Sequence, residues 1–326
     1  MQQLPFIDWD AAARVGRKAV HPGPELTPGG IAEVVDALRA ATGRATSHVL
    51  GVTGMAAPAH AKTLIVDRAG WISAMSVSAG ALLGALGAPT VATTTPQRLA
   101  GRVMAGNVGA GLAVVASRIL GQFDPFAEPK RLLLVAPNVV ATERKLGVNP
   151  TDFRLWICLH EETHRVQFGQ APWLVGHLQH LMRELLAEDE PLRQWRAGQK
   201  PHSLVDLMTT PAQHETFDRI TAVMSLMEGH ADVMMDRVGT AVLPTLPVIR
   251  RAFEAHRDRT GWAAIVSKLL GLDLKRAQYR DGAAFCNEVL RRADLETLNF
   301  AFSAADQLPT LAEIHDPPQW LHRVSR

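Results

Sequence analysis

Cysteine is almost absent from this chain. Only Cys158 and Cys286 occur among its 326 residues, and two cysteines cannot form the disulfide framework on which small secreted domains depend. The first residues also lack the charged and then apolar layout of a secretory signal. We therefore expect a cytoplasmic protein in which Cys158 is a small buried side chain.

The chain also has no block of basic residues. Its 34 lysines and arginines are scattered among 32 aspartates and glutamates, which leaves a net charge of +2. Nucleic-acid-binding surfaces concentrate basic side chains and interleave them with aromatic ones, so we expect no nucleic-acid partner. Internal repeats, a glycine-rich phosphate loop and a nucleophile elbow are missing too.

Charged residues are missing between residues 69 and 97, and only Arg102 and Arg118 are charged between residues 99 and 120. Both apolar runs are long enough to be tested as membrane spans. They are rich in Ala, Gly, Ser and Thr, which contribute little to insertion, and Pro89 interrupts the first run. We expect both runs to form close-packed, buried helices and the chain to have no membrane span.

The overall composition, 47% hydrophobic and 20% charged, is typical of a globular protein. A short apolar run within residues 130–137, ended by Pro137, predicts one strand, and residues 64–66 are either a second strand or a helix entry. Helical periodicity dominates elsewhere, so we expect a mainly α (α+β) fold with a small β element. Helices are expected at residues 8–20, 27–42, 152–170, 172–197, 213–238, 240–257, 262–270 and 283–293.

The length allows one or two domains. We expect a mainly helical N-terminal part, residues 1–131, packed on a metal-binding part, residues 132–326. The alternative is a single structural unit. At the start of the helix predicted from residue 152, Thr151 or Asp152 is the expected N-cap.

The chain's chemistry centres on His160-Glu161-Glu162-Thr163-His164. Residues four apart share one face of a helix, so His160 and His164 can bind one ion, and Glu161 lies about 100° round the helix beside them. This HExxH pattern is the zinc signature of metalloproteases. Neutral imidazoles bind Zn²⁺, an open position holds a water, and an adjacent carboxylate serves as general base.

A third ligand is needed, and the best candidates lie in Met227-Glu228-Gly229-His230-Ala231-Asp232. Glu228 and Asp232 are four apart and share a face of the helix predicted over residues 213–238. His230 is the competing ligand, but it is turned about 200° from Glu228. An unbroken helix therefore cannot aim both at one metal ion.

The pattern Glu-x-x-x-Asp after HExxH resembles that of the gluzincins. This resemblance implies that Glu228 is the third zinc ligand and that Asp232 accepts a hydrogen bond from a ligating histidine. It also implies a side chain, outside the zinc ligands, that donates a hydrogen bond to the oxyanion formed during the reaction. The candidates are Tyr279, which is the only tyrosine, and His230. A purely structural role is the alternative for both.

Nearly the whole chain resembles a bacterial family of zincin-like hydrolases often labelled as associated with deazaflavin cofactor biosynthesis. The resemblance implies a zincin-like metalloprotease fold and a bound zinc ion. Its matching segments, besides the two motifs, are IDW at 7–9, DRAGW at 67–71, LGQFDP at 120–125, PN at 137–138, QYRDG at 278–282 and PPQWL at 317–321.

We therefore expect a zinc-dependent hydrolase of gluzincin type that acts on a peptide or a small related amide. The strand at 130–137 is expected to lie along the cleft and pair with an extended substrate, or else to be a buried strand without that role. Two alternatives to the predicted function are a zinc-binding protein without peptidase activity and a non-peptidase metal hydrolase acting on a cofactor precursor. The sequence predicts no oligomeric state.

Overall fold

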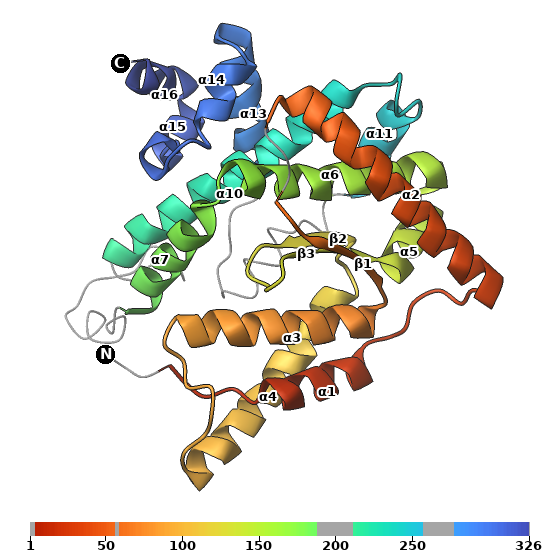
Figure 1. Ribbon diagram of the computed structural model, residues 1–326, viewed down its shortest axis with the longest axis vertical. Coiled ribbons are helices and arrows are strands. Elements are labelled where there is room, and N and C mark those ends of the chain that lie inside the picture. Colours follow the sequence, from red (N-terminus) through yellow and green to blue (C-terminus); the bar gives the residue numbers. More distant parts are fainter. Residues whose placement is uncertain (1–3, 56–58, 188–210, 257–276, 326) are drawn as a thin grey trace. The chain divides into compact units, whose positions relative to one another are not determined.

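The protein is mainly helical, as predicted, and contains one small sheet (Figure 1). The computed structural model describes residues 4–55, 59–187, 211–256 and 277–325. Its chain divides into two compact units. We call Leu4–Gln170 with Met234–Trp262 the sheet unit, and Met1–Gln3 with Ala171–Val233 and Ala263–Arg326 the helical unit. The division predicted after residue 131 stays a prediction.

The sheet unit contains three strands, β1 (Lys62–Val66), β2 (Gly121–Asp124) and β3 (Arg131–Val135). The strand order is β1-β3-β2, with β1 parallel and β2 antiparallel to β3. The predicted strand within 130–137 is therefore confirmed, and residues 64–66 form part of a strand. The helices of this unit are α1 (Trp9–Ala19), α2 (Pro28–Thr53), α3 (Arg68–Ala85), α4 (Thr95–Ala116), α5 (Ala136–Leu146), α6 (Pro150–Gln170) and α11 (Leu246–His256).

The expectation that the strand at 130–137 pairs with substrate is wrong. β3 lies between β1 and β2, with Leu133 opposite Leu64 on one side and opposite Gln122 on the other. Both of its edges already have hydrogen-bonded partners, so no further strand can be added to it. The edge strands of this sheet are β1 and β2.

Helix α6 is fixed at its start by two polar contacts. Asn149 Oδ1 accepts hydrogen bonds from the N–H groups of Thr151 and Asp152, at 3.0 and 3.1 Å. Asn149 is thus the capping side chain, and the predicted cap at Thr151 or Asp152 is wrong. The Asp152 carboxylate instead accepts from the Thr245 N–H at 2.9 Å and the Thr245 hydroxyl at 2.7 Å, which ties α6 to the segment leading into α11.

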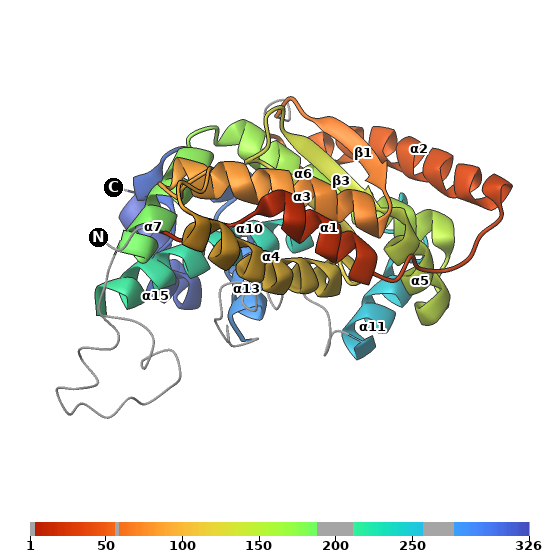
Figure 2. The same cartoon turned by 90° about the horizontal axis from the view of Figure 1, so that it is seen from below.

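Helices α1 and α4 approach closely through glycine. A Cβ atom added at Gly109 of α4 would lie 2.5 Å from the Ala12 carbonyl oxygen of α1, and one added at Gly16 would lie 2.9 Å from the Gly109 carbonyl oxygen. Figure 2 shows the two helices side by side. The expectation of close-packed helices therefore holds for this side of α4.

Among the described residues, the helical unit includes the helices α7 (Leu174–Ala187), most of α10 (Pro211–Val238), α13 (Ala277–Arg292), α14 (Leu295–Phe300), α15 (Leu311–His315) and α16 (Pro317–Val324). Its core includes Phe285 and Trp320, whose ring centroids are 5.3 Å apart. Helices α10 and α13 cross at two glycines. A Cβ atom at Gly282 would lie 2.0 Å from the Ser225 carbonyl oxygen. The helix predicted at 262–270 and the predicted continuation at 188–197 lie outside the described residues.

Candidate metal centre and active site

Helix α6 brings His160 and His164 together, as the HExxH spacing predicts. Their Nε2 atoms are 3.2 Å apart, and the two rings are nearly perpendicular. Two nitrogen ligands of a tetrahedral zinc, each ~2.0–2.1 Å from the ion, lie ~3.3 Å from each other. The imidazole pair therefore has the spacing that one zinc ion requires.

Gln167 orients the second of these histidines. Its side-chain oxygen lies 2.9 Å from His164 Nδ1, and Gln167 is fully buried. An Nδ1–H donated to this oxygen leaves Nε2 without a proton, which is the form that binds a metal. Sequence reasoning missed Gln167. Its position three residues after His164, one turn along the same helix, was the available signal.

Glu161 is held against the edge strand β2. One of its carboxylate oxygens, Oε2, accepts a hydrogen bond from the Phe123 N–H at 2.9 Å, and the side chain is buried. A Cβ atom at Gly121 would lie 2.7 Å from Glu161 Cγ and 2.9 Å from Oε1. The resemblance includes Gly121 and Phe123 within the segment at 120–125, but no pattern in the sequence assigned them a role.

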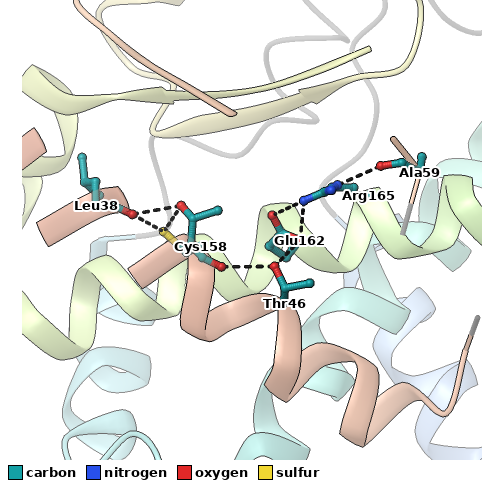
Figure 3. A network of polar contacts seen from close by, with 7 residues as sticks. Leu38, Thr46, Ala59, Cys158, Glu162 and Arg165 are labelled. Carbon is teal, nitrogen blue, oxygen red and sulfur yellow. Dashed lines mark hydrogen bonds and ion pairs between the residues drawn. The ribbon is translucent and has the colours of Figure 1, made fainter. Parts of the chain in front are cut away.

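The next residue, Glu162, lies on the side of α6 that contacts α2 (Figure 3). Its carboxylate accepts from the Thr46 hydroxyl of α2 at 3.1 Å and pairs with the Arg165 guanidinium at 3.1 Å. Arg165 also donates to the Ala59 carbonyl oxygen at 2.9 Å. Burial raises the pKa of Glu162, and the charge of Arg165 opposes that shift. This network fixes α6 on α2 and leaves the histidine face to the other side of the helix.

Cys158 belongs to the same buried side of α6. Its sulfur lies 3.5 Å from the Thr42 hydroxyl of α2, and burial raises the pKa of the thiol to about 12 (Figure 3). A thiol with such a pKa is not a nucleophile at neutral pH. The structure therefore confirms the expectation that Cys158 is a small buried side chain.

Helix α10 runs without interruption through Glu228, His230 and Asp232. Glu228 and Asp232 are half-buried, whereas His230 is fully buried with its ring centroid 5.2 Å from that of Phe302. A Cβ atom at Gly229 would meet the Gly282 backbone at 2.1 Å. The intervening glycine is thus required by the crossing of α10 with α13, and His230 packs into the core of the helical unit.

The predicted site residues are divided between the two units of the chain. His160, Glu161 and His164 belong to the sheet unit, whereas Glu228 and Asp232 belong to the helical unit. Tyr279 lies on α13, but its side chain falls outside the described part of the chain. The ligand role of Glu228, the hydrogen-bonding role of Asp232 and the oxyanion roles of Tyr279 and His230 stay predictions.

Comparison with known proteins gives two matches that extend over nearly the whole chain. A family model described as zincin-like metallopeptidase matches residues 7–321. The crystal structure of a presumed hydrolase with a novel fold from Chloroflexus aurantiacus has a TM-score of 0.76 and 26% sequence identity, and the match covers 98% of this chain and 99% of that one. A search of curated proteins found no match.

Proposed function

The chain belongs to the zincin-like metallopeptidase family. From this membership we propose that it is a zinc-dependent hydrolase of gluzincin type, which cleaves a peptide bond or a related amide bond in a small substrate. The similar crystal structure from Chloroflexus aurantiacus is also described as that of a hydrolase. The proposal goes further than these matches in naming the metal, the residues and the bond that is cleaved.

His160, His164 and Glu228 are the proposed zinc ligands. The histidine pair has suitable spacing and a buried acceptor at His164 Nδ1. Glu228 is assigned from the Glu-x-x-x-Asp motif on the unbroken helix α10. Two imidazoles and one carboxylate form a donor set typical of catalytic zinc sites, which leave a position open for water or substrate.

The position of Glu161 is the observation that carries the proposal. When bound, zinc acidifies a water molecule to a pKa of ~7 and polarises a carbonyl group. Glu161 Oε1 would take the proton of the attacking water and return it to the leaving amine, while the Phe123 N–H holds Oε2 in place. A structural zinc site is closed by four protein ligands and has no use for a base beside it.

The remaining predicted residues have supporting roles in this proposal. Asp232 would accept a hydrogen bond from a zinc-bound imidazole, which fixes the tautomer and raises the basicity of that ligand. Tyr279 and His230 remain the candidate donors to the oxyanion that forms during attack. The deazaflavin association, a cytoplasmic location and the absence of a nucleic-acid partner stay predictions.

Metal analysis and peptide cleavage test the proposed function together. Wild-type protein purified with zinc should contain one zinc ion per chain and cleave members of a random peptide library. Glu161→Gln should retain the zinc and lose most turnover, by ~100-fold or more, because only the proton acceptor is removed. Stoichiometric zinc without cleavage of peptides or small amides by either protein would favour the two alternatives, a zinc-binding protein without peptidase activity or a non-peptidase metal hydrolase.

A further inference from the structure

One side of helix α4 presents a row of apolar residues to the outside. Leu99, Val103, Gly106, Ala110 and Val114 are spaced by three or four residues and therefore share a helix face, which we call the outer face of α4. Leu99 and Val103 are each 66% exposed, and Val114 is 49% exposed. A Cβ atom at Gly106 would meet nothing within 4 Å.

The stretch of chain that precedes α4 carries further exposed apolar side chains. Val77 of α3 is 68% exposed, and Val91 in the connection from α3 to α4 is 70% exposed. Together with Leu99 and Val103, they are the four most exposed large hydrophobic side chains among the described residues. A soluble surface rarely concentrates its most exposed apolar side chains in one segment without a binding role.

The charged side chains of the segment that contains α4 are all positive. No aspartate or glutamate occurs between Arg68 and Asp124. Arg98 and Arg102 of α4 and Arg118 just beyond its end are exposed, and none of the three forms an ion pair within the described part of the chain. The surface therefore combines apolar side chains with unneutralised cationic ones.

The opposite side of α4 is not available for a partner. Gly109 contacts α1 at backbone distance, and Leu112, Ala113 and Ala116 are buried; Figure 2 shows α1 beside α4. By length and composition α4 is the one helix among the described residues that could cross a membrane. A helix with one side packed on its own unit can present only its outer face, so it can lie on a bilayer without spanning it.

We propose that the outer face of α4 docks this protein on the surface of an anionic lipid bilayer. Leu99, Val103 and Val114 would enter the boundary between head groups and acyl chains, and the three arginines would lie among the anionic head groups. A second copy of the chain fits this surface less well, because symmetric pairing would bring together two sets of arginines from a segment that contains no acid. This inference does not depend on the proposed hydrolase activity.

Vesicle binding by the full chain tests the inference. Wild-type protein should co-sediment with vesicles of phosphatidylcholine and phosphatidylglycerol, bind vesicles of phosphatidylcholine alone at least ~10-fold more weakly, and dissociate at high salt. The double variant Leu99→Asp/Val103→Asp should lose at least ~10-fold in binding to the mixed vesicles. The matched control is Ile31→Asp, since Ile31 of α2 is also exposed but lies outside this surface.

Arg98→Gln/Arg102→Gln should weaken binding to the mixed vesicles several-fold and reduce its salt dependence. Circular dichroism establishes that each variant is folded. Failure of the wild type to bind the mixed vesicles, or equal binding by the Leu99→Asp/Val103→Asp variant, would overturn the inference. So would a wild-type dimer that becomes monomeric in this variant, since the face would then belong to a second copy of the chain.

Discussion

Gly121 leaves just enough room for the carboxylate of Glu161. A Cβ atom there would lie within 3.0 Å of Glu161 Cγ, Cδ and Oε1, and the carboxylate also depends on its hydrogen bond from Phe123. Gly121→Ala should therefore displace the proposed general base without touching a proposed metal ligand. A displacement of ~1 Å can cost ~100-fold in rate, so we expect normal zinc content and a loss of turnover of that order.

The control for this substitution is Gly111→Ala. Gly111 lies on α4 in the same unit, and a Cβ atom there would meet nothing within 4 Å. It should leave both zinc content and turnover unchanged. Equal turnover in Gly121→Ala and wild type would show that Glu161 tolerates the methyl group or is not the base.

Substitutions of Glu228 and His230 should differ in their effect on metal binding. Glu228→Ala should lose most zinc affinity, because it removes a proposed ligand. His230→Ala should keep the zinc and lower the melting temperature, since it removes a fully buried ring that packs on Phe302. Zinc titration and thermal unfolding of both variants separate the two effects. Zinc loss in His230→Ala alone would reverse the ligand assignment.

At the scale of elements, the crossing of α10 and α13 positions the carboxylates of α10. Gly229 and Gly282 meet backbone to backbone, so a side chain at either position must push the helices apart. Overpacking of this kind typically costs ~1–3 kcal/mol or more. We expect Gly282→Ala to lower the free energy of unfolding by at least this amount and to weaken zinc binding through the shifted Glu228.

Gly176→Ala serves as the comparison for Gly282→Ala. Gly176 lies on α7 in the same unit, is exposed, and has nothing within 4 Å of an added Cβ atom. Alanine there should be neutral or stabilise the helix by up to ~1 kcal/mol. Urea unfolding of the three proteins measures the difference, and a Gly282→Ala protein as stable as wild type would contradict the observed close approach.

The sheet shows where prediction from sequence reaches its limit. The strand β3 was predictable from its short apolar run, and the helix carrying HExxH from its periodicity and motif. Both are local signals. The partner strand β1 is not local, because Leu133 pairs with Leu64, which lies far earlier in the chain. The sequence therefore did not indicate that β3 is central or that Phe123 of an edge strand contacts Glu161.

At the scale of the whole molecule, the family match covers residues 7–321 and agrees with the mainly α class and with the hydrolase assignment. The two motifs occupy separate units, each built from discontinuous stretches of chain. The spacing of residues on one helix is fixed by helix geometry, so the histidine pair was predictable. The relation between α6 and α10 depends on tertiary packing, for which short motifs carry no direct signal.

On the ribosome, β1 leaves the exit tunnel long before the strand that pairs with it. The chain is made in the order β1, α3, α4, β2, β3, α5, α6, and at ~5–20 residues per second the edge of β1 is without its partner for several seconds. A nascent chain that stalls with β2 outside the tunnel and Arg131 still inside it would expose two unpaired strands and should be prone to aggregate. Once Val135 has emerged the sheet can close, so the Phe123 N–H is already in place when the segment carrying Glu161 leaves the tunnel.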